Sequence, residues 1–205
     1  MRMVVGIDEA GRGPLAGPVA VGIVRAPEGF DFLAAFPGLN DSKKLSEKKR
    51  EALFALLEER VAAGDLTYVV KLRTAQDIDQ RGIAVVIREA IASGLKPLLP
   101  DTSGGKVWLD GALIAPEIYE QETVIGGDGL VPAIMLASIA AKVTRDRLMV
   151  QVSDTYPEYG FAQHKGYGTK AHMDALRAHG LCDIHRATFI RPDRLPSVSG
   201  VPVVG

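Results

Sequence analysis

The spacing of apolar and polar positions predicts strands and helices along most of the chain. Runs rich in β-branched residues and bounded by glycine, proline or aspartate are typical of strands, and they cover residues 3–8, 18–25, 66–72, 107–110 and 123–125. Apolar residues recur at helical spacing in four other segments, which are residues 46–60, 74–93, 132–149 and 170–179. The early strands follow one another closely, and the later ones are separated by helices. This order favours an α/β fold with a mixed sheet and a small helical C-terminal part.

Residues that favour helix ends accompany these segments. Ser46 suits the N-cap of the first helix, and Thr74 with Asp77 fits a capping box at the start of the second. Pro132 suits the first turn of the third helix, which is apolar enough to be largely buried. Thr169 is placed to cap the last helix.

Composition and charge describe an ordinary soluble globular protein with one large domain. The 205 residues are 47% hydrophobic and 24% charged, and the formal net charge is −1. This net charge neither suggests nor excludes a nucleic-acid partner, so only local clusters decide that question. No uncharged run reaches the roughly 18–20 residues of a membrane span, and Asp8 and Glu9 stand where a signal peptide needs an apolar core. We therefore expect a cytoplasmic protein without a membrane partner. We also expect a monomer, because no exposed apolar helix is left unexplained.

Acidic residues directly follow three predicted strands, each beside a glycine or a glycine-rich turn: Asp8 with Glu9, Asp110, and Asp128. Functional sites of open α/β sheets lie at such strand ends. If these strands are neighbours, four carboxylates converge, which is unfavourable unless protons or cations neutralise them. Oxygen-only ligands select Mg²⁺ or Mn²⁺, and two such cations suit phosphodiester cleavage. One aspartate alone could simply end a strand, but the four together favour a metal site.

A glycine-rich turn and two basic clusters flank this predicted metal site in the sequence. Gly11-Arg12-Gly13 lets the backbone approach a ligand closely and offers Arg12 to a phosphate. Residues 42–50 hold five basic residues against one acidic residue, and residues 160–195 hold six against three. The second cluster includes Tyr167 between two glycines, which suits a sugar or base stacked on the ring with phosphates around it.

Four histidines lie in the second basic cluster: His164, His172, His179 and His185. Their spacings fit no recognised zinc pattern, and the single cysteine, Cys182, has no partner in a CxxC pair. We therefore expect surface or capping histidines rather than a zinc site, and a small buried side chain at Cys182.

Several motifs follow one another in a fixed order from Gly6 to about Phe189. They are the glycine-rich run at 6–18, the Asp-Ser-Lys-Lys-Leu segment at 41–45, Asp-Gly at 110–111, Gly-Asp at 127–128, the helix segment 137–146 and His-Lys-Gly-Tyr-Gly-Thr at 164–169. Together they resemble the type 2 ribonucleases H, in their bacterial form ribonuclease HII. The resemblance implies a ribonuclease H-like fold with a mixed central sheet flanked by helices. We accordingly expect a catalytic domain at 1–153, a helical substrate-binding part packed on it at 154–191, and a flexible tail at 192–205.

The resemblance also implies an activity. It is that of a metal-dependent endonuclease that cuts RNA in RNA/DNA hybrids and cuts 5′ of single ribonucleotides in duplex DNA. The implied products carry 3′-hydroxyl and 5′-phosphate ends, and the implied cofactor is Mn²⁺ or Mg²⁺. The catalytic metal ligands carried over by motif are Asp8, Glu9, Asp110 and Asp128.

Substrate contacts are implied in the same way. Gly11-Arg12-Gly13 would read the ribonucleotide 2′-hydroxyl, largely through backbone groups, and Tyr167 would pack on the deoxyribose that follows. Both roles agree with the residue types, because the 2′-hydroxyl distinguishes RNA from DNA and close backbone approach needs glycine. Candidate phosphate contacts, some of which could only brace the fold, are Lys43, Lys44, Lys142, Arg145 and Lys165. Ser138 and Asp146 lie in an apolar helix and are expected to pack against the sheet rather than touch substrate.

One departure from the family pattern lies beside Asp128. Many members carry a lysine just before the Gly-Asp pair, where this chain has Gly126, and residues 129–131 are less polar than expected. Asp128 keeps its spacing of ten residues before Ser138. The departure therefore concerns a substrate or metal contact near Asp128 and not the cleavage chemistry.

Three other interpretations fit the sequence less well. Type 3 ribonuclease H prefers longer ribonucleotide tracts and usually carries an extra N-terminal domain, whereas this chain begins its first strand at Met3. A nucleic-acid binding module that has lost catalysis would lack a carboxylate of the metal site, and all four are present. A small-molecule phosphate enzyme would need a phosphate cradle, but the glycine loop lacks the GxxxxGK[ST] lysine and leads into a strand.

Overall fold

The central sheet is mixed, as the order of the strands predicts. The computed structural model describes residues 2–190, and the tail expected at 192–205 lies outside them. Five strands lie in the order β3-β2-β1-β4-β5, and their bounds are β1 Met3–Ala10, β2 Val19–Pro27, β3 Thr67–Arg73, β4 Gly105–Asp110 and β5 Glu120–Val124. The β1–β2 and β2–β3 pairs are antiparallel, whereas the β1–β4 and β4–β5 pairs are parallel. β1 and β4 therefore run side by side and end at the same edge.

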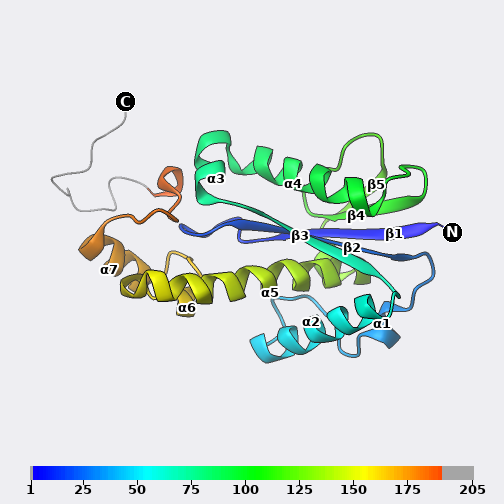
Figure 1. The fold of residues 1–205 in the computed structure, drawn as a ribbon, viewed down its shortest axis with the longest axis horizontal. Coiled ribbons are helices and arrows are strands. Elements are labelled where there is room, and N and C mark those ends of the chain that lie inside the picture. The colour runs from blue at the N-terminus through cyan, green and yellow to red at the C-terminus, as the bar shows by residue number, and fades with distance from the viewer. Residues whose placement is uncertain (1, 191–205) are drawn as a thin grey trace.

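Helices cover both faces of this sheet (Figure 1). The helices on one face are α1 Phe32–Ala35, α2 Glu47–Ala62 and the long α5 Pro132–Thr155, and those on the other are α3 Ala75–Arg81 and α4 Ile83–Leu98. Alternation along the strands produces the two layers, because Ile7 and Ile23 pack with α4 while Val24 and Ala26 pack with α2 and α5. None of the helices within residues 2–190, α5 included, is long and apolar enough to cross a bilayer.

Two strand glycines let α5 lie directly against the sheet. A Cβ at Gly6 of β1 would stand 2.2 Å from the carbonyl carbon of Ala133. A Cβ at Gly22 of β2 would stand 2.2 Å from the carbonyl oxygen of Ala137. Both distances are far inside van der Waals contact, so a residue without a side chain is required where the strands pass under this helix.

The predicted helix starts are confirmed, and one predicted helix is divided. Ser46 caps α2, the Thr74 side chain caps α3, and Pro132 opens α5. The segment predicted as one helix at 74–93 forms α3 and α4, because Gly82 between them adopts a φ of 81° that interrupts the helix. α4 also continues to Leu98 and α5 to Thr155, beyond their predicted ends.

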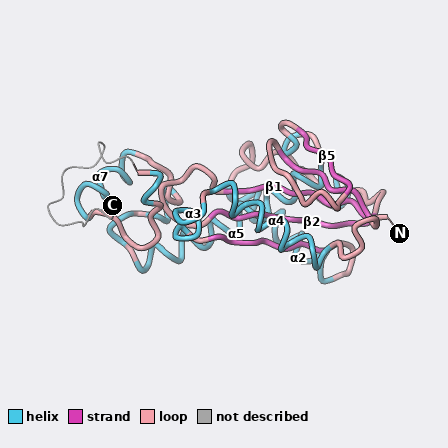
Figure 2. Tube along the Cα trace, turned by 90° about the horizontal axis from the view of Figure 1, so that it is seen from above, coloured by secondary structure: helices cyan, strands magenta, loops and turns pink. Residues whose placement is uncertain are grey.

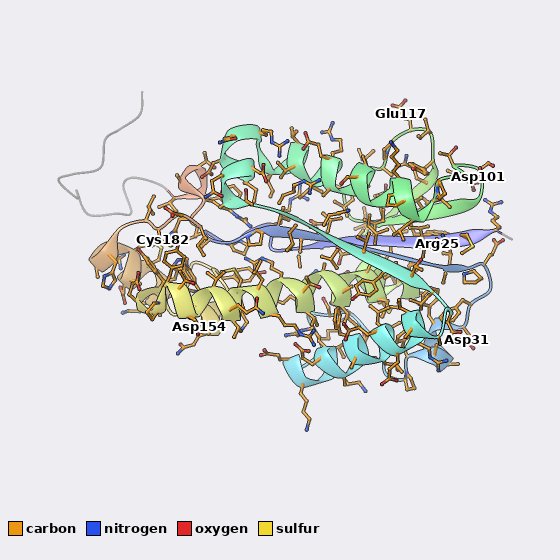
Figure 3. All side chains as sticks on the ribbon, viewed as in Figure 1. Arg25, Asp31, Asp101, Glu117, Asp154 and Cys182 are labelled. Atoms are coloured by element: carbon orange, nitrogen blue, oxygen red, sulfur yellow. The ribbon has the colours of Figure 1, made fainter. Side chains whose placement is uncertain are left out.

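Short helices after α5 form the end of the molecule far from the N-terminus (Figure 2). They are η2 Pro157–Tyr159, α6 Phe161–His164, α7 Lys170–His179 and η3 Ala187–Phe189. Thr169 caps α7 as predicted. An apolar cluster that includes Phe161, Leu176 and Met149 of α5 joins this part to the rest of the fold. Cys182 is half-buried beside it (Figure 3).

Candidate active site

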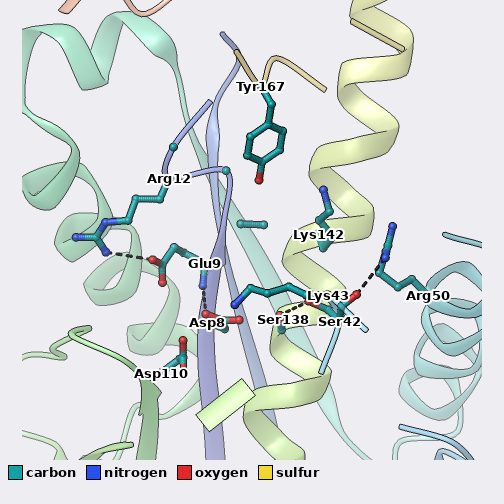
Figure 4. A pocket seen from close by; sticks show the side chains of 13 residues that line it. Asp8, Glu9, Arg12, Ser42, Lys43, Arg50, Asp110, Ser138, Lys142 and Tyr167 are labelled. Carbon is teal, nitrogen blue, oxygen red and sulfur yellow. Dashed lines mark hydrogen bonds and ion pairs between the residues drawn. The ribbon is translucent and has the colours of Figure 1, made fainter. Parts of the chain in front are cut away.

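Three aspartates meet at one edge of the sheet. Asp8 lies in β1 and Asp110 ends β4, and these strands are parallel neighbours, so the two carboxylates lie close together (Figure 4). Asp128 comes from the short 3₁₀ helix η1 Gly127–Gly129, and its N–H donates to Asp110 Oδ1 at 3.2 Å. One oxygen from each carboxylate lies within 4.8 Å of the other two. This spacing lets all three bind one divalent cation.

Glu9, the fourth predicted carboxylate, lies beside this cluster rather than in it. Its Oε1 accepts a hydrogen bond from Arg12 at 3.1 Å, and its side chain is 14% exposed (Figure 4). The N–H of Glu9 donates to Asp8 Oδ1 at 2.7 Å. The structure therefore brings three of the four carboxylates together and leaves Glu9 ion-paired in the same cleft.

Burial makes ionisation of Asp8 unfavourable. Its side chain is buried, and this burial raises the pKa of Asp8 to about 8, with smaller contributions from the negative charges of Glu9 and Asp110. Hydrogen bonds from Ser138 and from the N–H of Glu9 act in the opposite direction. A divalent cation would relieve this penalty, and carboxylate oxygens are the ligands that Mg²⁺ and Mn²⁺ prefer. The donor set therefore fits the cation that the sequence predicts.

A lysine ammonium lies against the aspartate cluster. Lys43 Nζ is 2.7 Å from Asp128 Oδ2, and this hydrogen bond raises the pKa of Lys43. The backbone that carries Lys43 is anchored at the preceding residue, Ser42. The hydroxyl groups of Ser42 and Ser138 are hydrogen-bonded at 2.8 Å, and Arg50 donates to the Ser42 carbonyl oxygen at 3.0 Å. Lys43 is thereby placed where it competes with a cation for Asp128.

Lys43→Gln is expected to strengthen the binding of Mn²⁺ to the protein in the absence of nucleic acid. The Lys43 side chain is 77% exposed, so solvent weakens its ion pair, and we expect the Kd to fall by about fivefold. Isothermal titration calorimetry with MnCl₂ measures this Kd. Lys44→Gln is the matched control, because Lys44 faces Asp41 at 3.7 Å and lies outside the cleft. An unchanged Kd in Lys43→Gln would rule out the competition.

Four cleft residues were not predicted as site residues: Ala10, Ser42, Arg50 and Ser138. Ser138 was expected only to pack against the sheet. α5 does pack there, but Ser138 also reaches Asp8, because the helix lies so close to β1. The available signal was a single hydroxyl within the apolar run 133–141.

Asp8 and Asp110 line a cleft of about 410 Å³, and Asp128 lies beside them. The other walls of the cleft are the Gly11-Arg12-Gly13 loop after β1, Lys142 of α5, and Tyr167 between α6 and α7 (Figure 4). Tyr167 is 43% exposed, and Lys142 Nζ lies 5.7 Å from the centroid of its ring. This wall can contact the sugar or base of a nucleic acid while its phosphate lies near the aspartates.

Arg186 holds the glycine loop from inside the protein. Its fully buried guanidinium donates to three carbonyl oxygens, those of Gly11 at 2.7 Å, Gly17 at 2.9 Å and Arg12 at 3.0 Å. Burial, with a smaller contribution from the nearby charge of Arg145, lowers the pKa of Arg186 to about 9. The loop is thus fixed by a residue that sequence analysis did not assign to the site.

Arg145 is buried and does not line the cleft, so the phosphate contact considered for it does not fit the structure. Its guanidinium donates to the carbonyl oxygens of Ala16, Pro18 and Lys165. Its Nε would stand 2.0 Å from a Cβ at Gly11, whose φ is +86°. Freeing the guanidinium would leave buried carbonyl groups without donors. Of the two roles expected for Arg145, phosphate contact and bracing of the fold, its contacts fit the second.

The candidate lysines other than Lys43 are placed differently from one another. Lys142 lines the cleft and donates to Asp146 at 2.8 Å. Lys165 donates to the carbonyl oxygen of Ala162. Neither Lys165 nor Lys44 lines the cleft, so of these three only Lys142 is placed to meet a substrate bound there.

The histidines are another correction to the sequence analysis. His164, His172 and His185 are buried, whereas surface or capping positions were expected; His179 is exposed. The three buried rings pack with Phe161, and the rings of His164 and His172 are stacked with centroids 4.5 Å apart. The apolar face of α7 carries His172 inward, which spacing alone did not reveal.

Comparison with known proteins finds one family along nearly the whole chain. The family model described as Ribonuclease HII matches residues 5–192. The ribonuclease HII of Endomicrobium trichonymphae is 45% identical over 187 residues, which are 91% of this chain and 84% of the relative. The crystal structure of ribonuclease H2 from Pyrococcus horikoshii OT3 is 28% identical with a TM-score of 0.73, and the match covers 91% of this chain and 93% of that one. Bst-RNase HIII in complex with Mn²⁺ shares the fold, with a TM-score of 0.63 at 15% identity over 87% of this chain and 63% of that one.

Proposed function

This chain belongs to the ribonuclease HII family and is an endoribonuclease of the ribonuclease H type, and we propose that it cuts RNA in RNA/DNA hybrids and 5′ of single ribonucleotides in duplex DNA. The proposed products carry 3′-hydroxyl and 5′-phosphate ends. One observation carries the proposal: three aspartates lie within 4.8 Å of one another, and two of them, Asp8 and Asp110, line a cleft together with a glycine loop and an exposed tyrosine. The aspartates supply ligands for the metal ions that hydrolysis needs, and the glycine loop and the tyrosine on the opposite wall select the nucleotide.

We infer that Asp8, Asp110 and Asp128 hold Mn²⁺ or Mg²⁺, and that Glu9 joins them when it separates from Arg12. The oxygen-only donor set and the raised pKa of Asp8 support this assignment. Two divalent cations bound there would activate a water molecule and stabilise the leaving 3′ oxygen. Mn²⁺ in the complex of Bst-RNase HIII, a protein of the same fold, agrees with the inferred cofactor.

Cationic side chains near the aspartates suit a phosphodiester backbone. Arg12 has its side chain 49% exposed, and binding a phosphate would draw it away from Glu9. Lys43 would likewise exchange Asp128 for a phosphate oxygen when a cation takes its place. Lys142 lies between these groups and Tyr167. We assign these three side chains to binding and orienting the scissile strand.

The glycine loop is proposed to read the ribonucleotide 2′-hydroxyl. Arg186 binds the carbonyl oxygens of Gly11 and Arg12 within the protein, while the same loop lines the cleft. A Cβ at Gly13 would meet no atom within 4 Å, so this position is open to a ligand. A backbone held rigidly in this way can discriminate a hydroxyl from a hydrogen because its groups need no rearrangement.

Tyr167 is proposed to pack on the deoxyribose that follows the ribonucleotide. The ring is exposed toward the cleft and comes from the loop between α6 and α7, whereas Asp8 and Asp110 come from the sheet and Asp128 from η1 (Figure 4). We therefore propose that residues 1–153 supply the chemistry and residues 154–191 help to select the substrate.

Incision of a DNA duplex that contains one ribonucleotide tests this function. The purified protein is incubated with that duplex, with an RNA/DNA hybrid and with an all-DNA duplex, in Mg²⁺, in Mn²⁺ and in EDTA, and the product ends are mapped. We expect metal-dependent cuts 5′ of the single ribonucleotide and within the hybrid, and none in all-DNA. Cutting of the hybrid alone would instead indicate type 3 specificity, and binding without cutting in either metal would indicate an inactive binding module.

A further inference from the structure

The loop that carries Tyr167 is tied to three buried histidines. Tyr167 donates its N–H to the carbonyl oxygen of His164 at 2.9 Å, and the Gly166 N–H donates to His164 Nδ1 at 3.2 Å. The carbonyl oxygen of Tyr167 lies 3.0 Å from His172 Nδ1, and His172 Nε2 lies 3.0 Å from His185 Nε2. A chain of imidazole contacts therefore leads from the exposed tyrosine into the protein.

The protons in this chain have one arrangement. The backbone N–H of Cys182 points at His185 Nδ1 at 2.9 Å, so this nitrogen is the acceptor and the proton of neutral His185 is on Nε2. His185 Nε2 then donates to His172 Nε2, and the proton of His172 is on Nδ1. His172 Nδ1 therefore donates to the Tyr167 carbonyl oxygen. Two further contacts of His185 Nδ1 are longer: the Cys182 thiol at 3.1 Å can donate to it, and the Cys182 carbonyl oxygen lies at 3.2 Å. The Tyr167 carbonyl oxygen requires the same arrangement from the other end of the chain, because it can only accept a proton from His172 Nδ1.

Burial keeps both rings neutral. His172 is fully buried and His185 is 5% exposed, and burial lowers the pKa of His172 and lowers that of His185 to about 4. A second proton on His172 would place two hydrogens between the facing Nε2 atoms, and a second proton on His185 would lie on Nδ1, facing the N–H of Cys182. The contact at 3.0 Å thus requires one neutral donor and one neutral acceptor.

We propose that His172 is a positioning residue that sets the orientation of Tyr167 toward the substrate by donating its Nδ1 proton to the Tyr167 carbonyl oxygen, in the tautomer fixed by His185. This inference rests on the proposed role of Tyr167 in contacting the sugar. His185 is followed by Arg186, which holds the glycine loop at Gly11 and Arg12. The dipeptide His185-Arg186 thereby contacts both elements that are proposed to recognise the ribonucleotide: the Tyr167 loop, through His172, and the glycine loop, through Arg186.

Two substitutions of His172 separate this role from simple packing. In His172→Asn the amide nitrogen can take the place of Nδ1 and keep the donor, whereas in His172→Gln the amide takes the place of Nε2 and the donor to Tyr167 is lost. On a duplex with one ribonucleotide in Mn²⁺, we expect His172→Gln to lower kcat/KM by about tenfold and His172→Asn to stay within about threefold of wild type. Equal losses in both variants would contradict the proposal.

A double-mutant cycle with Tyr167→Ala tests whether the effect passes through the tyrosine. In the Tyr167→Ala background, His172→Gln is expected to cause no further loss of kcat/KM. Losses that multiply independently would overturn the proposal while leaving the proposed function intact. If wild type cuts no ribonucleotide-containing duplex at all, the proposed function fails, and the cycle has no baseline.

The tautomers can be measured without any substrate. In ¹⁵N NMR spectra of the wild-type protein, we expect His172 to be protonated at Nδ1 and His185 at Nε2. This measurement does not depend on activity or on the folding of a variant. The opposite tautomer at His172 would leave no proton for the Tyr167 carbonyl oxygen and would refute the positioning role.

Discussion

Asp8→Asn is expected to abolish cleavage and at the same time to stabilise the protein in the absence of divalent cations. Loss of one cation ligand should lower kcat/KM by about 10³-fold or more, because the variant retains substrate binding but not the charge that holds the cation. The gain in stability has a separate cause. The folded protein holds the pKa of Asp8 near 8, above its ordinary value of 3.8, so folding disfavours the ionised form.

The sign of this effect follows from the direction of the shift. Because the folded-state pKa is raised, the ionised carboxyl destabilises the folded state increasingly as pH rises from about 4 to about 8. Asparagine has no such charge, so the difference between variant and wild type should be small near pH 4 and largest near pH 8. At pH 7 we expect the free energy of unfolding to rise by about 1–3 kcal/mol, since one pKa unit corresponds to about 1.4 kcal/mol.

Chemical denaturation in EDTA at several pH values measures this difference. Asp101→Asn is the matched control, because Ser103 hydrogen bonds lower the pKa of that exposed carboxyl and its removal should not stabilise the protein. Adding Mn²⁺ should then stabilise wild type but not Asp8→Asn, since only a folded cation site gains from the metal. A variant that is inactive but no more stable than wild type would show that Asp8 is ionised without cost.

Gly22→Ala is expected to destabilise the protein by about 3 kcal/mol and to reduce activity in the molecules that still fold. The new Cβ would stand 2.2 Å from the carbonyl oxygen of Ala137, which is backbone and has nowhere to move. Gly22 also pairs with Asp8 across β1 and β2, and Ala137 precedes Ser138. A helix displaced at this point would therefore also separate Ser138 from Asp8.

Thermal unfolding measures the first effect, with an expected fall in Tm of roughly 6–12 °C. Gly129→Ala serves as the stability control, because a Cβ at Gly129 would meet no atom within 4 Å. Similar Tm values in the two variants would show that α5 can shift from the sheet at little cost.

Features specified within a few residues were predicted from the sequence, and features made by distant contacts were not. The caps at Ser46, Thr74 and Thr169 depend on neighbouring N–H groups, so local patterns were sufficient. The division of one helix at Gly82 depends on a φ that glycine permits but does not require. Sequence alone therefore predicted a helix there and missed its interruption.

The candidate site divides in the same way. The convergence of Asp8, Asp110 and Asp128 followed from strand ends and the order of motifs, and the structure confirms their proximity. The pairing of Glu9 with Arg12 and the bond between Ser42 and Ser138 depend on how separate elements approach one another. The spacing of residues along the sequence does not predict how close these side chains come to one another.

The grip of Arg186 on the glycine loop has a consequence for the order in which the protein is assembled. Arg186 and Gly11 are 175 residues apart in sequence, whereas every aspartate of the cluster has been synthesised by residue 128. A chain emerging from the ribosome therefore acquires its cation ligands well before the side chain that fixes its recognition loop. Closing so large a loop is slow compared with forming local contacts. The capacity to bind metal should accordingly precede the capacity to choose a nucleotide. Other nucleic acids are then protected from the incomplete protein only if cleavage waits for the last helices to dock.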